Sequence, residues 1–224
     1  MPAADPSATA PERSPIPLWR KLLFSAIFTA LVLAVVLGAL EGALRLAGYG
    51  YSARFHRTAR LPDGTALVRE NRWCTAPFFS PELVRRPQPM RLPAEKGPRT
   101  FRVFVLGSSA AMGDPEASFS LSRVLEKLLA AAYPEVEFEV VNAGITAVNS
   151  HLVRGVARDC AALAPDLFIV FEGNNEVIGP FGPASVFTPF LRSTTAVRAA
   201  AALKSTRAGQ WVASLGRAAR RGGD

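Results

Sequence analysis

The sequence predicts a mixed α/β protein with a parallel sheet, preceded by one membrane-spanning helix. Three observations lead to this prediction. An uncharged, strongly apolar run covers residues 22–40, near the N-terminus. From residue 100 onward, three apolar strand-like runs alternate with amphipathic helical segments, which is the pattern of βαβ units with right-handed crossovers. A basic segment without a further strand pattern follows from residue 184.

Length and charge limit the possible functions. With 224 residues, 49% of them hydrophobic, the chain can bury the core of one α/β domain. The net charge is +8, and much of it comes from the region between Val177 and Asp224, which has seven basic residues and one acidic residue. Because no zinc-finger spacing, helix-turn-helix pattern or aromatic platform accompanies this charge, nucleic acid is not expected as a partner. A solvated helix face and contact with anionic lipid headgroups remain as interpretations.

The N-terminal region divides into a tail and an anchor. Residues 1–18 are rich in proline, alanine and serine, which predicts a disordered tail. Residues 19–43 are predicted as a membrane helix, since 19 uncharged residues at about 1.5 Å each span the hydrocarbon layer. Trp19 on one side and Tyr49 and Tyr51 on the other fit interfacial anchors.

A cleaved signal peptide is the alternative to an anchor. Such peptides have an apolar core of about 7–15 residues and a small-x-small exit. Here the exit reads LGALEGALRL, with Leu37 or Glu41 at the critical upstream position, which favours an uncleaved anchor. Basic residues flank both ends of the helix, so their count does not set the orientation. Since long domains translocate largely regardless of charge, we expect the N-terminus inside and the domain outside.

Residues 44–98 are predicted as an irregular juxtamembrane stalk that packs against the domain. This segment is rich in proline and arginine and has no sustained period. Two cysteines, Cys74 and Cys160, are too few and too far apart for a disulfide framework or a metal site. Cys160 lies in an apolar helical stretch, where a buried free thiol is expected. A single Cys74–Cys160 disulfide is the alternative to two free thiols.

Residues 99–183 are predicted as the α/β domain. Its strands cover 100–106, 136–142 and 166–172, and the third is nearly all apolar, as is typical of a strand buried on both faces. Asp114 and Pro115 are predicted to begin a helix. A helix over 120–133 places five apolar side chains on one face: Leu121, Val124, Leu125, Leu128 and Leu129. A second helix is expected over 149–163, and residues 184–224 form a basic helical segment without a fourth strand.

Small and polar residues follow each predicted strand, at the edge where parallel sheets bind ligands. These loops cover 107–113, 142–150 and 173–176. They lack the lysine of a P-loop and the G-x-G-x-x-G of a dinucleotide fold. Tight structural turns explain any one loop. Acyl chemistry explains all three, because a serine at a strand-to-helix turn can act as a nucleophile while backbone N–H groups and an asparagine amide stabilise an oxyanion.

The motifs GSSAAMG, VVNAGITAVNS and EGNNE, in this order, resemble blocks I, II and III of the SGNH (GDSL-type) hydrolases. The closest likeness is to membrane-anchored bacterial members with GNNE in the third block, often followed by tetratricopeptide repeats. The resemblance implies a flavodoxin-like three-layer α/β/α fold and no metal or other cofactor. It also implies Ser109 as nucleophile, the Ala147 N–H as backbone oxyanion donor and the Asn174 amide as side-chain oxyanion donor. The implied supporting residues are Gly107, Ser108, Gly113, Gly144, Gly173 and Asn175.

The sequence departs from the family pattern at four points. Ser108 replaces the aspartate of block I, Ala147 replaces a glycine of block II, and Asn175 replaces the aspartate of block III. The Asp-x-x-His that carries the family's general base is missing. Of the two histidines, His56 falls in the predicted stalk, and His151 follows block II at the start of a helix.

We therefore expect the N-terminal part of a membrane-anchored esterase, acyl hydrolase or O-acyltransferase that continues beyond Asp224. The domain would lie on the extracytoplasmic side of a bacterial membrane, and the substrate would be an acyl ester or an acylated glycan. The alternative is a catalytically incomplete module that binds an acylated or glycan ligand or a protein partner. A third possibility is a lipid-surface protein whose basic C-terminal helices are the working part.

Overall fold

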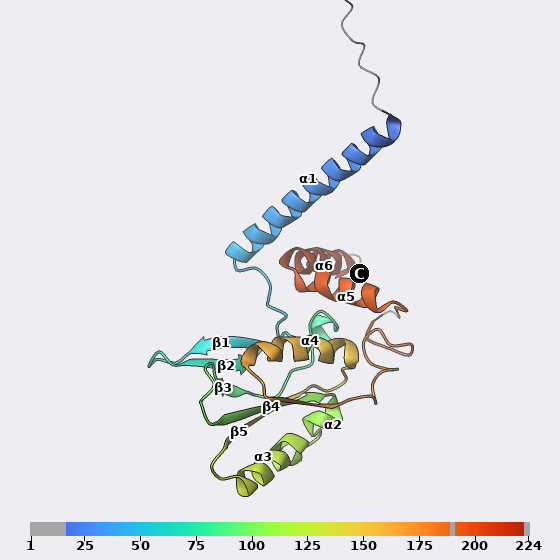
Figure 1. Ribbon diagram of the computed structural model, residues 1–224. Coiled ribbons are helices and arrows are strands. Elements are labelled where there is room, and N and C mark those ends of the chain that lie inside the picture. Colours follow the sequence, from blue (N-terminus) through green and yellow to red (C-terminus); the bar gives the residue numbers. More distant parts are fainter. Residues whose placement is uncertain (1–16, 189–190, 222–224) are drawn as a thin grey trace, which may run out of the picture. The chain divides into compact units, whose positions relative to one another are not determined.

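The computed structural model describes residues 17–188 and 191–221 (Figure 1). It divides into two compact units, one ending at Gly48 and the other beginning at Tyr49. The tail expected to be disordered, residues 1–18, lies almost entirely outside the described residues.

The first unit is formed by one helix, α1 (Leu18–Leu46). It has 29 residues, more than the 25 predicted for 19–43, and its most apolar window has a mean hydropathy of 2.6. No residue of this helix is buried. The helix is long and apolar enough to cross a membrane. Near its C-terminal end, Arg45 pairs with Glu41 one turn earlier, at 2.7 Å.

The segment predicted as an irregular stalk contains a three-stranded antiparallel sheet. Its strands are paired in the order β1-β2-β3: β1 (His56–Arg60), β2 (Ala66–Glu70) and β3 (Arg91–Pro93). The prediction of an irregular structure was therefore wrong. These strands alternate too weakly in hydropathy to be recognised, because four of the five β1 residues are polar or charged. The expected packing against the domain does occur, through Phe55, Val68 and Leu92.

The second sheet is parallel, with strand order β5-β4-β6, as the βαβ pattern predicted. Its strands are β4 (Thr100–Gly107), β5 (Glu137–Gly144) and β6 (Leu167–Phe171). Helix α3 (Leu121–Ala132) covers one face and α4 (Ser150–Cys160) covers the other (Figure 1). The remaining helices are α2 (Ser109–Met112), α5 (Thr194–Ser205) and α6 (Arg207–Arg221), with short 3-10 turns at Pro81–Leu83, Ala117–Phe119 and Ala161–Leu163.

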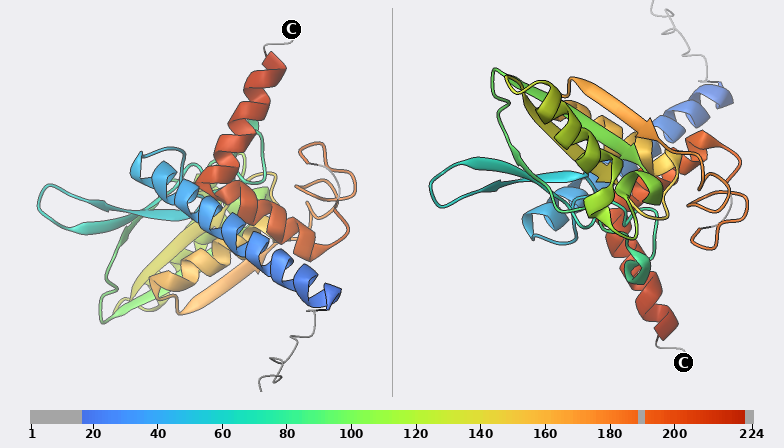
Figure 2. Two further views of the ribbon diagram at one scale, coloured as in Figure 1. Left: turned by 90° about the horizontal axis from the view of Figure 1, so that it is seen from above. Right: turned by 90° about the horizontal axis from the view of Figure 1, so that it is seen from below.

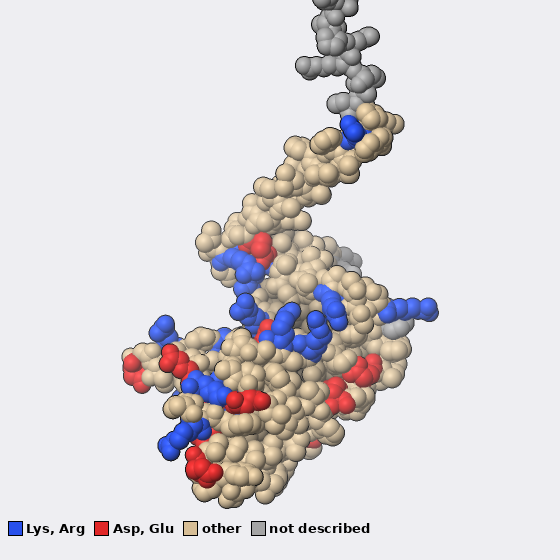
Figure 3. Space-filling view, viewed as in Figure 1, with Lys and Arg blue, Asp and Glu red and all other residues tan. Residues whose placement is uncertain are grey.

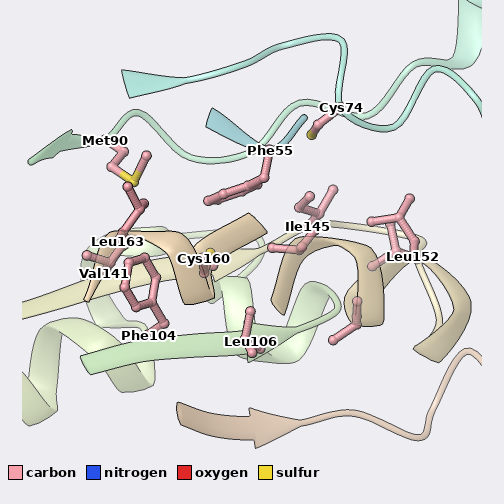
Figure 4. Close-up of a cluster of buried hydrophobic side chains, with 14 of the residues drawn as sticks. Phe55, Cys74, Met90, Phe104, Leu106, Val141, Ile145, Leu152, Cys160 and Leu163 are labelled. Atoms are coloured by element: carbon pink, nitrogen blue, oxygen red, sulfur yellow. The ribbon is translucent and has the colours of Figure 1, made fainter. Parts of the chain in front are cut away.

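Two hydrophobic clusters lie on the two faces of β4. The larger one combines side chains from the antiparallel sheet and its loops with those of the parallel sheet and α4 (Figure 4). Phe55 and Met90 pack there with Phe104 and Leu106. The region that was predicted as a stalk is thus part of the domain core, and its removal would expose β4.

Both cysteines are free and buried in this larger cluster. Burial raises the pKa of the Cys74 thiol to about 12. Burial likewise raises the pKa of Cys160, and the nearby Asp159 carboxylate acts in the same direction. Since reactivity requires the thiolate, neither thiol is a ready nucleophile at neutral pH.

A buried arginine joins the two sheets. Arg102 on β4 is fully buried, and its guanidinium donates to the Glu139 carboxylate of β5 at 2.6 Å. The same group donates to the carbonyl oxygens of Leu163 and Pro93, at 2.6 and 3.2 Å. Because the charge is paired and hydrogen-bonded on several sides, this position tolerates an ion that would otherwise be costly to bury.

The start of helix α3 differs from the prediction. Asp114 and Pro115 were expected to begin this helix, but it begins at Leu121, after Ser120. The Asp114 carboxylate instead accepts a hydrogen bond from the Thr146 hydroxyl at 3.0 Å. The predicted apolar face of this helix is only partly buried, since Leu125 and Leu129 pack against the core while Leu121, Val124 and Leu128 are exposed.

The third strand is the clearest departure. We expected it to be buried on both faces, but Leu167, Phe168, Val170 and Phe171 have exposed fractions of 36–63%. The strand order explains the difference: β6 pairs with β4 alone, and no strand within residues 17–188 and 191–221 occupies its other edge (Figure 2, right, orange arrow). The helical segment expected over 184–224 is found from Thr194 onward, as α5 and α6, whereas the described residues between 184 and 193 are not helical; no fourth parallel strand occurs in that region of the described chain.

Candidate active site

The three predicted loops leave the parallel sheet at the same level. The register pairs Gly107, the last residue of β4, with Gly144 of β5 and with Phe171 of β6. The loops that contain Ser109, Ala147 and Asn174 therefore begin side by side at the C-terminal edge of the sheet. In open parallel sheets this edge is where ligands bind.

Close backbone packing explains why the loop after β4 begins with glycine. A Cβ atom at Gly107 would lie 2.0 Å from the Phe171 carbonyl oxygen, and the φ of this residue is +153°. At Gly144, an added Cβ would lie 2.5 Å from the Met112 backbone nitrogen. A side chain at either position would push a neighbouring segment away from the edge where Ser109 lies.

Ser109 is the first residue of α2 and is half-buried. Its hydroxyl has no hydrogen-bond partner within the described part of the chain, whereas its carbonyl accepts from the N–H groups of Gly113 and Asp114, at 3.0 Å each. A serine needs a neighbouring base to become a good nucleophile. Among the described residues, the structure places no such base at hydrogen-bond distance.

The two histidines lie elsewhere. His56 Nε2 lies 3.2 Å from the carbonyl oxygen of Asp159. His151, on α4, lines a cavity of about 740 Å³ together with Phe55 and Asp159, and Ser109 is not part of that lining. Neither imidazole has a hydrogen bond to Ser109 in the regions the structure describes.

Ser108 and Asn174 are joined directly. The Ser108 hydroxyl, which is fully buried, donates to Asn174 Oδ1 at 2.7 Å. This bond holds the carbonyl end of the amide, so the Nδ2 end, which has no hydrogen-bond partner among the described residues, can donate to another group. Ser108 thus orients the amide that the resemblance assigns to the oxyanion.

Ala147 has a left-handed backbone, with φ of +61°. Such a conformation is uncommon for residues other than glycine, asparagine and aspartate and costs about 1 kcal/mol or more. The backbone N–H of Ala147 makes no hydrogen bond to another described residue. Ala147 therefore has a conformation that glycine adopts readily, together with an available donor.

Side-chain hydrogen bonds connect the loops to one another. Asn142 Nδ2 donates to the Met112 carbonyl at 2.9 Å, which ties the loop after β4 to β5. Glu176 accepts from the backbone N–H and the hydroxyl of Ser150, at 2.8 and 2.7 Å, and Asn149 Nδ2 donates to the Pro180 carbonyl at 2.9 Å. These bonds fix the loop after β6 to the start of α4.

The remaining predicted supporting residues lie in the same loops. Gly113 follows the last residue of α2, and Gly173 immediately precedes Asn174. Asn175 is buried, and its carbonyl accepts from the Gly179 N–H at 2.7 Å. All of these residues therefore belong to one rim, and their chemical roles stay predictions.

The structure adds Glu172, which the sequence reading did not single out. Both carboxylate oxygens are buried and have no hydrogen-bond partner of good geometry among the described residues. Burial raises the pKa of Glu172 and the nearby Glu176 adds to the rise, while the Gly173 N–H and the Ser108 hydroxyl oppose it. The signal in the sequence was an acidic residue that ends the apolar run LFIVF directly before Gly173.

No group of three or more His, Cys, Asp or Glu side chains that could hold a metal ion occurs within residues 17–188 and 191–221. Comparisons with protein-family models, with curated proteins and with solved structures give no match.

Proposed function

We propose that this protein is a membrane-anchored serine hydrolase of the SGNH (GDSL) type, either an esterase or an O-acyltransferase. In this proposal the fold is flavodoxin-like, and the domain lies on the extracytoplasmic side of a bacterial membrane. The observation that carries the proposal is the shared level at which three loops leave the sheet, through Gly107, Gly144 and Phe171. These loops bring a serine, a free backbone N–H and a free side-chain amide to one edge.

The chemistry follows from these three groups. Ser109 Oγ attacks the carbonyl carbon of an acyl ester, the bond to the alcohol oxygen breaks, and the acyl group passes to water or to a sugar hydroxyl. The Ala147 N–H and Asn174 Nδ2 donate to the negative oxygen that forms on the way. One such donor typically accounts for a factor of about 10²–10³ in rate.

The proposal assigns no residue of this chain as the general base. Ser109 has no hydrogen-bonded histidine among the described residues, and loss of a base in serine hydrolases lowers the rate by several orders of magnitude. This observation favours the second candidate function, in which the same rim binds an acylated or glycan ligand, or a protein partner, without turnover.

The test is covalent labelling of the full chain, reconstituted in lipid vesicles, with a fluorophosphonate probe. We expect labelling of the wild type, none of Ser109→Ala, and about 10²-fold slower labelling of Asn174→Ala. Ser118→Ala, which changes an exposed serine in the 3-10 turn after α2, is the matched control and should label normally. Persistent labelling of Ser109→Ala would contradict the assignment of the nucleophile.

The second function has its own readout. If the wild type is not labelled but binds an O-acetylated oligosaccharide, and Asn174→Ala weakens that binding, the rim is a binding site. If neither labelling nor binding occurs, both candidate functions fail.

A further inference from the structure

Helix α6 packs against the domain with its polar side. Gln210 is only 7% exposed; its Oε1 accepts from the Tyr51 N–H at 2.9 Å, and its Nε2 donates to the Tyr51 carbonyl at 3.0 Å. One turn further, the Ser214 hydroxyl lies 2.9 Å from the Tyr49 hydroxyl. Gly209, Ala213 and Arg217 line a cavity of about 620 Å³ between this side of the helix and the domain, together with Lys204 of α5. The side that faces the protein therefore consists of polar, small and basic residues.

The opposite side of α6 is apolar and exposed. Trp211, Val212 and Leu215 have exposed fractions of 38, 61 and 51%. Residues four apart lie on the same side of a helix, so Trp211 and Leu215 are neighbours, with Val212 beside them. A surface helix normally buries its apolar side. The reversed arrangement in α6 presents a contiguous apolar strip, which is typical of a contact surface.

The helical segment that carries this strip has charges of one sign. Between Arg192 and Arg221 the sequence has seven basic residues and no acidic residue. Arg198, Lys204 and Arg217 are exposed in the structure. Most of the charged side chains that Figure 3 shows over α5 and α6 are basic. An apolar strip on a cationic helical segment is complementary to a surface that has anionic groups above a hydrocarbon layer.

The short connection between α1 and Tyr49 also favours a lipid surface as the partner of the apolar strip. Only Ala47 and Gly48 separate the last residue of α1 from Tyr49, whose hydroxyl bonds to α6. Where α1 crosses a membrane, α6 is therefore tethered within a few residues of the membrane surface. A tethered contact forms at a high effective concentration, so a strip of three large side chains is sufficient.

We propose that α6 lies in the membrane interface, with Trp211, Val212 and Leu215 inserted below the headgroups of anionic phospholipids. The summed positive charge of the segment from Arg192 to Arg221 attracts those headgroups, while Arg217 itself lies on the domain side of α6. This interaction holds the rim with Ser109 in a constant position relative to the lipid surface. The inference rests on α1 as an anchor and is independent of any chemistry at Ser109.

The test measures the depth of one side chain. The full chain with Val212→Cys carries a nitroxide spin label and is reconstituted in vesicles of phosphatidylcholine with phosphatidylglycerol. Leu128→Cys on α3 is the matched control, because Leu128 and Val212 have similar exposed fractions, 63 and 61%. The wild type gives the background, since both of its cysteines are buried.

We expect oxygen to relax the label at position 212 several-fold more than the label at 128, and a water-soluble nickel complex to relax it several-fold less. Equal water accessibility at the two positions would overturn the proposal. Dipolar broadening at position 212 that disappears on dilution with unlabelled chain would show that a second copy, not lipid, covers the strip, and would also overturn it.

A second set of variants tests the headgroups. Changing Arg198, Lys204 and Arg217 together to glutamine, or using phosphatidylcholine alone, should reduce the oxygen-to-nickel contrast at position 212 at least several-fold. An unchanged contrast would refute the role of anionic headgroups. Trp211→Ser with Leu215→Ser should reduce the contrast while the far-ultraviolet circular dichroism stays the same. An unchanged contrast in that variant would refute insertion of the strip.

Discussion

Strands β4 and β6 are similar in composition but opposite in burial. In β4, Val103 to Leu106 are at most 1% exposed, whereas four of the five residues of β6 are 36–63% exposed. β6 reads LFIVF, and β4 has the similar run FRVFVL between Thr100 and Gly107. What differs is the neighbourhood: β4 has a strand on each side and a helix on each face, whereas β6 pairs with β4 alone among the described strands. An apolar run thus indicates a strand, but its place in the sheet order determines how much of it is buried.

The largest expected effect on stability comes from replacing one phenylalanine in β4, compared with one in β6. Phe104→Ala removes a fully buried side chain from β4 and should lower the free energy of unfolding by about 3–5 kcal/mol. Phe171→Ala removes a side chain that is 53% exposed and should cost less than about 1 kcal/mol. Urea unfolding of the two variants measures both values. Equal losses would mean that β6 is covered in solution.

The junction of the two strands should be nearly as sensitive. Gly107→Ala places a Cβ at 2.0 Å from the Phe171 carbonyl oxygen and at a φ of +153°, so we expect a loss of about 3 kcal/mol or more. Gly155→Ala on α4 is the matched control, since an added Cβ has no neighbour within 4 Å. In a helix interior that change should stabilise by about 0.5–1 kcal/mol. Tolerance of Gly107→Ala would show that β6 can move away from β4.

Glu172 sharpens the comparison, because its carboxylate oxygens are buried although it directly follows an exposed strand. Its pKa is raised by burial, so the stability that it contributes is fully present below the unfolded value of about 4.3 and is lost as the pH rises through the folded pKa. Glu172→Gln should remove this loss and become increasingly more stable than the wild type as the pH rises. Thermal unfolding between pH 4 and pH 8 measures the difference.

Glu116→Gln is the control, because the pKa of Glu116 is lowered by folding whereas that of Glu172 is raised. Hydrogen bonds from the Ser118 side chain and N–H lower the pKa of Glu116, so its contribution is present above the unfolded pKa and lost as the pH falls. A Glu172→Gln variant whose stability follows the wild type at every pH would contradict the burial of that carboxylate.

The smallest expected effect concerns the loop after β5. Ala147→Gly relieves a φ of +61° and should raise the free energy of unfolding by about 0.5–1 kcal/mol. Ala130→Gly, at an exposed position inside α3, should lower it by about 1 kcal/mol. Guanidinium unfolding measures whether the free energy of unfolding rises in Ala147→Gly and falls in Ala130→Gly. A loss of stability in Ala147→Gly would mean that the methyl group contributes more by packing than the backbone conformation costs.

Local pattern predicted much of the α/β unit. The strand that ends at Gly107 and the two helices follow from the local hydrophobic pattern, and the parallel direction follows from the alternation of strands and helices along the chain. The same is true of α1, whose length and uncharged central run over 22–40 are local properties. The rim with Ser109, Ala147 and Asn174 was predictable because parallel strands end at one edge.

What the sequence by itself determined is the type and order of these elements and the residues that follow each strand. Only the tertiary structure decided which surfaces are covered. The exposure of β6, the burial of Glu172, the inclusion of Phe55 in the core and the reversed orientation of α6 all depend on contacts between segments far apart in the chain. Hydrophobic burial is proportional to the area that neighbours remove from water, and those neighbours are set by the fold and not by the local run of residues.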